Sequence, residues 1–144
     1  MSAGPADLAE ARDELNRRCD AIESCYEFML AYAGQGLESE QGGKGSQIRE
    51  FLTKCDAALS GLADFLTSFV KRLDVETQAP YARFMAVIDR DARDAQAAVQ
   101  LVLAQPSISS QLVDNLNASI HLRALLTDLF LIDELLKARS AERA

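Results

Sequence analysis

The spacing of apolar residues constrains the fold of this chain more than any other feature. Apolar side chains recur at every third or fourth position through most of the sequence, which is the period of an α-helix with one buried face. The clearest seam is Ile48, Phe51, Leu52, Cys55, Leu59, Leu62, Leu66, Phe69 and Leu73. Alternating strand patterns are nearly absent, and only three prolines interrupt the 144 residues. The sequence therefore predicts an all-α protein.

The apolar seams divide into four predicted helices. They span about residues 6–34, 46–74, 77–104 and 107–138. The predicted caps are Gly34 and Gly36 at the end of the first helix, and Ser46, Thr77 and Ser107 or Ser109 at the starts of the others. Short connections between long helices make neighbours antiparallel. We expect one domain over residues 1–144, an up-down-up-down antiparallel four-helix bundle with a glycine-rich loop at 35–45.

Charge and composition narrow the classes of partner. The chain has 15 Lys and Arg against 22 Asp and Glu, a formal charge of −7 that repels phosphate backbones. The first residues lack the basic and apolar regions of a signal peptide, and no window resembles a membrane span. Three cysteines, an odd number, fit a reducing compartment. We expect a cytoplasmic protein that binds neither nucleic acid nor membrane.

The stretch GQGLESEQGGKGSQ at residues 34–47 resembles a phosphate-binding loop at first sight. A Walker A loop places lysine and a hydroxyl residue consecutively and follows a strand. Here Gly45 separates Lys44 from Ser46, and a helix precedes the loop. Weak anion contact at the next helix N-terminus stays open, but the composition favours a flexible connection between two helices.

Residues for catalysis or metal binding are scarce. His121 is the one histidine, and no carboxylate lies three or four positions from it, which argues against di-iron and two-histidine zinc sites. Asp114 and Asp128 lie seven residues to either side of His121, a spacing more simply explained by a polar helix face. A phosphotransfer histidine usually precedes a lysine and a glycine, and HLRAL contains neither. We predict no enzyme activity, cofactor or metal.

Two cysteines are predicted to come level in the first helical hairpin. Cys25 lies about nine residues before the end of the first helix, and Cys55 lies about nine after the start of the second. We therefore expect Cys25 and Cys55 to be a candidate redox pair. The alternative is that they are buried free thiols that pack as small hydrophobic residues.

The first and fourth predicted helices carry more apolar surface than one core face can bury. The first has a second stripe, Ala21, Cys25, Phe28 and Tyr32, and the fourth adds Leu112, Val113, Leu116 and Ile120, with Phe130, Leu131 and Leu135 on a further side. Up-down topology brings the two stripes to the same end of adjacent helices. We predict an exposed interface formed by Cys25, Phe28, Tyr32, Leu112, Val113, Leu116 and Ile120. A centrally buried fourth helix with a wide core face is the alternative.

These features favour a non-enzymatic interaction protein: an adaptor, an assembly factor or a small chaperone. We expect it to act as a homodimer through the first and fourth helices, with another protein partner left open. One alternative is a signalling or redox-sensing bundle that uses His121 or the Cys25 and Cys55 pair. Another is a binder of a small apolar ligand in the core among Tyr26, Phe51, Phe84 and Leu126.

Overall fold

The computed structural model describes residues 5–40, 47–73 and 79–143, and these residues form helices without any strand. The six helices are α1 Pro5–Ala33, α2 Ile48–Leu59, α3 Leu62–Arg72, α4 Ala79–Leu103, α5 Ser110–Ala118 and α6 His121–Arg143. The predicted all-α class is confirmed. The four-helix bundle is not confirmed in that form, because the second and fourth predicted helices are each divided into two.

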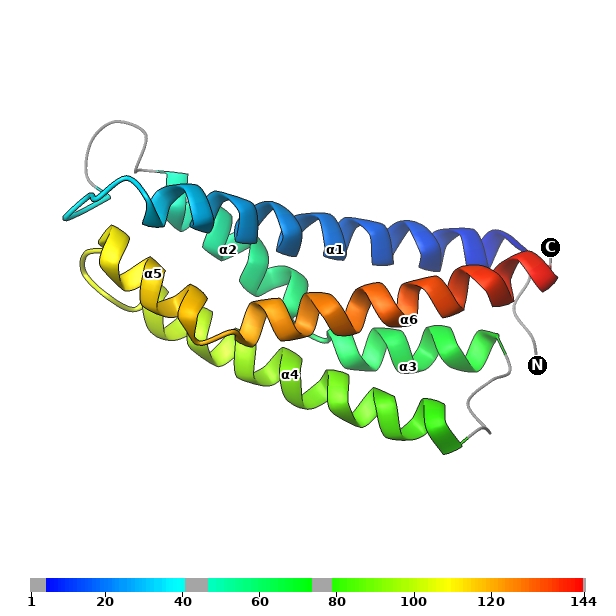
Figure 1. The fold of residues 1–144 in the computed structure, drawn as a ribbon. Coiled ribbons are helices and arrows are strands. Elements are labelled where there is room, and N and C mark those ends of the chain that lie inside the picture. The colour runs from blue at the N-terminus through cyan, green and yellow to red at the C-terminus, as the bar shows by residue number, and fades with distance from the viewer. Residues whose placement is uncertain (1–4, 41–46, 74–78, 144) are drawn as a thin grey trace.

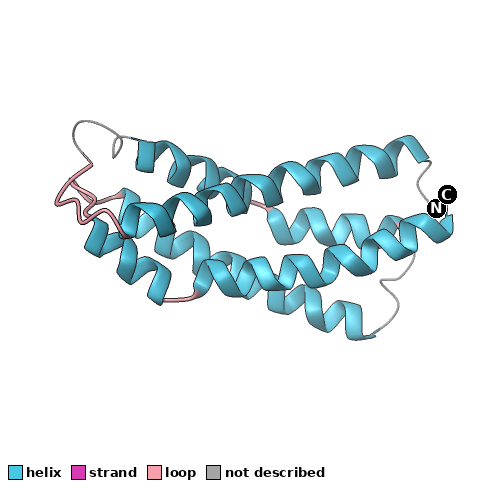
Figure 2. Cartoon of the chain, turned by 45° about the horizontal axis from the view of Figure 1, so that its top comes forward, coloured by secondary structure: helices cyan, strands magenta, loops and turns pink. Residues whose placement is uncertain are grey.

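The two long unbroken helices, α1 and α4, organise the other four. α2 and α3 follow one another back along α1, α4 reverses direction, and α5 and α6 follow one another back again (Figure 1). Both α1 and α4 contact each of the four shorter helices. α1 therefore begins at the end of the molecule where α6 finishes, as Figure 2 also shows.

A glycine divides α2 from α3. Gly61 has a φ of +70°, a left-handed conformation that costs glycine little. Arg18 of α1 donates from Nη1 to the carbonyl oxygens of Ala58 at 2.9 Å and Ser60 at 2.8 Å. Its guanidinium also lies 5.3 Å from the centroid of the Phe65 ring. The carbonyl groups released where α2 ends are thus paired by α1.

Some of the predicted caps fall inside the described residues. Ser109 caps α5, and its side-chain oxygen accepts a hydrogen bond from the Leu112 amide at 3.0 Å, which confirms one of the two predicted alternatives there. Ser46, Thr77 and the Lys44 region of the glycine-rich loop lie outside the described residues.

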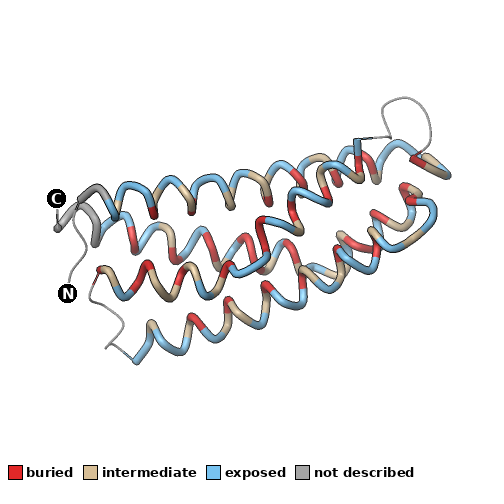
Figure 3. Tube along the Cα trace, turned by 180° about the vertical axis from the view of Figure 1, so that it is seen from behind, coloured by how far each residue is buried: buried red, intermediate tan, exposed pale blue. Residues whose placement is uncertain are grey.

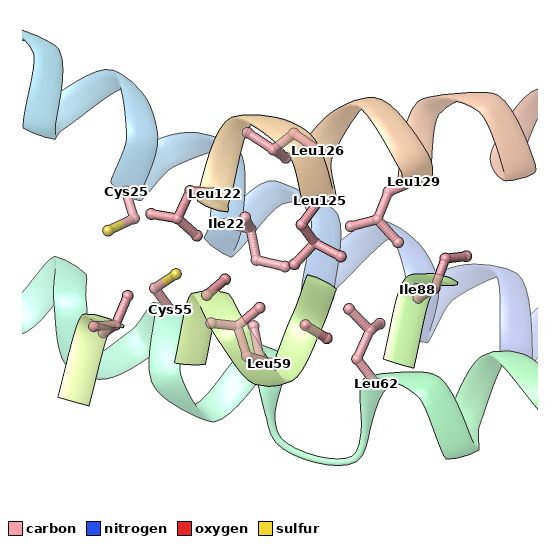
Figure 4. Packing of buried hydrophobic residues seen from close by; sticks show 14 of the residues in the cluster. Ile22, Cys25, Cys55, Leu59, Leu62, Ile88, Leu122, Leu125, Leu126 and Leu129 are labelled. Carbon is pink, nitrogen blue, oxygen red and sulfur yellow. The ribbon is translucent and has the colours of Figure 1, made fainter. Parts of the chain in front are cut away.

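The core is a continuous apolar cluster contributed by all six helices. In Figure 3 the buried residues lie along the inward side of the helices. Ile22, Leu59, Leu62, Ile88 and Leu125 meet where the two breaks and the long helices come together (Figure 4). α6 alone buries a wide face: Leu122, Leu125, Leu126, Leu129, Ile132 and Leu136. Burial of each large side chain contributes on the order of 1.5–3 kcal/mol.

A buried carboxylate connects the ends of α1, α2 and α4. Glu40 is 8% exposed and accepts hydrogen bonds from the Ile108 amide at 2.6 Å and from Arg49 Nε at 2.7 Å. Arg49 also donates to the carbonyl oxygens of Leu103 at 3.0 Å and Gln105 at 2.6 Å, where α4 ends. The Ile108 amide, and then the Arg49 guanidinium, hold the pKa of Glu40 below its usual range.

Tyr32 and Ser110 extend the same network. The Tyr32 hydroxyl donates to the Ile108 carbonyl at 2.6 Å, and the Ser110 hydroxyl donates to the Tyr32 carbonyl at 2.6 Å. Two hydrogen bonds then join Ser110 to Leu37. The Leu37 amide donates to the Ser110 hydroxyl oxygen, and the Ser110 amide donates to the Leu37 carbonyl, both at 2.8 Å. Every polar group in this cluster is therefore paired with another segment of the chain.

We expect Glu40→Gln to lower the free energy of unfolding by about 1–3 kcal/mol, because the new amide group faces donors and leaves a buried partner unpaired. Urea unfolding followed by circular dichroism measures the loss. Glu50→Gln is the matched control, since Glu50 forms an exposed pair with Lys54 at 3.1 Å that contributes at most about 1 kcal/mol. Equal effects of the two substitutions would contradict the role given to Glu40.

Candidate functional site

The predicted interface on the first and fourth helices is wrong for most of its residues. Cys25, Tyr32, Val113 and Leu116 are all buried, because α1 and α5 pack against each other. A straight helix buries one broad stripe, but the break before α6 lets α5 and α6 each turn a separate stripe inward. Cys25, Tyr32, Val113 and Leu116 therefore belong to the core, as the alternative of a wide core face supposed.

The remaining interface residues divide between half-buried and exposed. Phe28 and Leu112 are half-buried, and the Phe28 ring stacks on Phe51 with centroids 4.4 Å apart and planes 16° apart. Ile120 is the exposed member of the set, at 58%. A charged substitution at Phe28 would break this stacking, so it does not probe a free surface.

Exposed apolar side chains gather instead between α4 and α6. Leu131 is 55% exposed and Leu135 is 44% exposed, and both line a shallow groove with Pro80, Tyr81 and Phe84. We call these five residues the α4–α6 face. Phe130, 50% exposed, is the chain neighbour of Leu131. The sequence had indicated that Leu131 and Leu135 lie outside the main apolar face of their helix. Their neighbours on α4 could be identified only from the three-dimensional structure.

Two carboxyl groups meet along the same α4–α6 seam. Burial, and after it the hydrogen bond and charge of the neighbouring Asp91 carboxyl group, raise the pKa of Asp128 to about 7. Asp128 Oδ2 is buried and has no hydrogen-bond partner in the described part of the chain. Sharing a proton relieves the repulsion between two such carboxylates. The pair is therefore a site where the protein takes up a proton near neutral pH.

The structure brings the Cys25 and Cys55 thiols together. Both are fully buried, Cys25 on α1 and Cys55 on α2 (Figure 4). Contact with the Cys25 thiol, followed by burial, raises the pKa of Cys55 far above its usual value. Neither thiol is therefore poised as an exposed nucleophile.

His121 has no catalytic partner among the described residues. It is half-buried in the first turn of α6, and neither a hydrogen bond nor an ion pair joins it to Asp114 or Asp128 there. No group of three or more His, Cys, Asp or Glu side chains in the described ranges is arranged to hold a metal ion. The described helices also include none that is both long enough and apolar enough to cross a membrane.

The residues proposed to line a core ligand site do not surround one cavity. Phe51 stacks on Phe28 near the start of α2. Phe84 lines the groove near the start of α4, at the opposite end of the molecule (Figure 1).

The junction between α5 and α6 is strained. Ile120 has a φ of +61°, which a β-branched residue rarely adopts and which costs on the order of 1–3 kcal/mol. Its amide donates to the Asn117 carbonyl at 3.1 Å, and its carbonyl accepts from Ala124 at 2.8 Å. Both polar atoms of the Asn117 side chain are buried without a hydrogen-bond partner in the described residues. No sequence signal of the usual kind, such as glycine, marks this break.

Comparisons with protein-family models, curated proteins and solved structures found no match.

Because the backbone at Ile120 is strained, glycine substitutions at two nearby positions should change the free energy of unfolding in opposite directions. We expect Ile120→Gly to raise the free energy of unfolding by about 1 kcal/mol, because glycine adopts a left-handed conformation freely. Ala118→Gly, at an exposed helical position two residues earlier at the end of α5, should lower it by about 0.5–1 kcal/mol. Thermal unfolding of both variants tests this difference, and a loss of stability in both would contradict the strain.

The Asp91 and Asp128 pair predicts an unusual pH dependence. The pKa of Asp128 in the folded state lies above the value of about 3.9 of an unfolded aspartate, so the folded protein binds more protons between these two values. The contribution of Asp128 to the free energy of unfolding therefore falls as pH rises from about 4 to about 7. We expect Asp128→Asn to remove this decrease and to raise the melting temperature at about pH 8.

The control for this prediction is Asp114→Asn, which changes an exposed carboxylate on α5. Melting temperatures measured from about pH 5 to about pH 8 should keep the wild-type slope in this control. Parallel curves for wild type and Asp128→Asn would show that the pair is not coupled to folding.

Proposed function

We propose that this protein is a non-enzymatic interaction protein, an adaptor, assembly factor or small chaperone of the cytoplasm, that acts as a homodimer. The α4–α6 face, rather than the surface of α1 and α5, is the proposed contact. We also propose that the six helices work as an interrupted antiparallel four-helix bundle, in which α2–α3 and α5–α6 are each one leg. The single observation that carries the proposal is the exposed apolar cluster at this face.

The geometry of the face supports a helix-to-helix contact. Leu131 and Leu135 are separated by one turn of α6, and Pro80 and Phe84 are separated by one turn of α4. The two pairs border the same groove, so a helix of a partner could place its apolar side chains between them. Exposed apolar residues that cluster in this way are typical of interfaces, whereas isolated ones are not.

The distribution of charge favours a second copy at this face. α1 carries seven acidic and three basic side chains, a large part of the acidic excess of the whole chain. The exposed charged residues beside the α4–α6 face include both signs: Arg83, Glu134 and Lys137. Two copies that meet through α4 and α6 therefore avoid bringing their acidic α1 helices together.

We expect wild-type protein to have a solution mass of twice 15.7 kDa by light scattering coupled to size exclusion. The double variant Leu131→Glu, Leu135→Glu should elute as a folded monomer, because it places charge in the centre of the apolar contact. Unchanged far-ultraviolet circular dichroism would show that the variant remains folded.

Leu101→Glu is the matched control, since Leu101 is an exposed leucine near the opposite end of α4. This variant should remain dimeric. A wild-type monomer at about 100 μM, well above the dissociation constants of stable dimers, would overturn the homodimer. Dimerisation that survives the double variant would exclude the α4–α6 face.

A further inference from the structure

Three sulfur atoms meet in the core between α1 and α2. Cys25 and Met29 lie one turn apart on α1, and Cys55 faces them from α2; all three side chains are fully buried. The Cys25 thiol donates to Met29 Sδ at 3.7 Å and also contacts the Cys55 thiol. In Figure 4 the sulfur atoms of Cys25 and Cys55 project into the space between the two helices.

This meeting is notable because the chain has few sulfur atoms. It contains three cysteines and three methionines, and one of them, Cys25, contacts two of the other five, Met29 and Cys55. The third cysteine, Cys19, lies on α1 and is half-buried. Burial, with Asp133 adding to it, raises the pKa of the Cys19 thiol to about 11. Cys19 therefore provides a cysteine on the same helix that is not part of the sulfur cluster.

The donor set determines which ion would fit. Thiolate and thioether sulfur atoms are soft ligands that select Cu(I), whereas magnesium and calcium require oxygen. Structural zinc is almost always held by four nitrogen, oxygen or thiolate ligands, and two cysteines do not supply that number. Aliphatic side chains such as Ile22 and Leu122 lie beside the cysteines (Figure 4). Such surroundings exclude water and favour a soft, weakly hydrated cation.

We propose that Cys25, Cys55 and Met29 form a binding site for one Cu(I) ion. The ion joins α1 to α2 and is independent of the contact between copies proposed at the α4–α6 face. Binding replaces the proton of each coordinating thiol by the metal and involves no change of oxidation state. Because protons leave as the metal enters, the apparent affinity increases with pH.

The test is an anaerobic titration of the fully reduced, full-length protein with Cu(I), in competition with the chromophoric chelator bicinchoninate. We expect one equivalent of Cu(I) per chain to be withdrawn from the chelator. X-ray absorption at the copper edge should show a shell of sulfur neighbours only. Failure of the folded, reduced protein to compete with the chelator would overturn the proposal.

Four variants localise the site. Cys25→Ser and Cys55→Ser should abolish competition, and Met29→Leu should weaken it while preserving the apolar volume of the side chain. Cys19→Ser should bind like wild type. Circular dichroism identifies any variant that does not fold, and Cys25→Ala and Cys55→Ala replace serine variants that fail. Retention of copper by both folded cysteine variants, or its loss in Cys19→Ser, would overturn the assignment.

The same thiols could instead join as a disulfide, and the titration separates the two outcomes. The reduced protein is also treated with a small-molecule disulfide, which would accept the two electrons and two protons released by Cys25 and Cys55. If a Cys25–Cys55 disulfide forms and the reduced protein takes up no Cu(I), the cluster is a redox pair and the metal site is overturned. If the reduced protein binds Cu(I) and oxidation of Cys25 and Cys55 to a disulfide abolishes this binding, the result supports the metal site.

Discussion

Pairing of backbone carbonyl groups at helix ends is the constraint on which this fold depends. The C-terminal end of each helix leaves carbonyl groups without partners inside the helix, and two extra breaks increase their number. Arg18 supplies donors where α2 ends, and Arg49 supplies donors where α4 ends. A guanidinium has several donors in a fixed plane, so one side chain can pair two carbonyl groups at once. These two arginines therefore pair the carbonyl groups left free where α2 and α4 end.

The breaks also explain why apolar patterning alone predicted an exposed surface from residues that are mostly buried. Periodicity correctly indicated the helical class, because it reports which positions repeat on one face. It does not report that a helix changes direction, so the stripes of α5 and α6 looked like two faces of one helix. Gly61 was a visible signal for the first break, although a continuous apolar seam ran across it. Ile120 offered no such signal, because a β-branched residue rarely adopts the left-handed backbone that it has here.

The candidate sites were predictable to the extent that they depend on spacing along one hairpin. Counting from the helix ends placed Cys25 level with Cys55, and the structure puts their thiols in contact. Met29 was missed as a third sulfur, because a methionine at helical spacing is expected to pack as an ordinary apolar core residue. The meeting of Asp91 with Asp128 depends on the register of α4 against α6, which no local pattern specifies.

The two ends of the molecule differ in character: polar groups at one end are hydrogen-bonded within the chain, whereas apolar side chains at the other end border open grooves. At the end where α4 finishes, Glu40 and Arg49 are joined in hydrogen bonds that link several segments. At the end where α4 begins, Tyr81 lies between two grooves: one shared with α6, and one lined by Val70, Met85 and other residues of α3 and α4. Apolar side chains there border open surface on both sides of α4. Because the polar end already has its partners within the chain, the start of α4 is the part of this fold most suited to contact with another molecule.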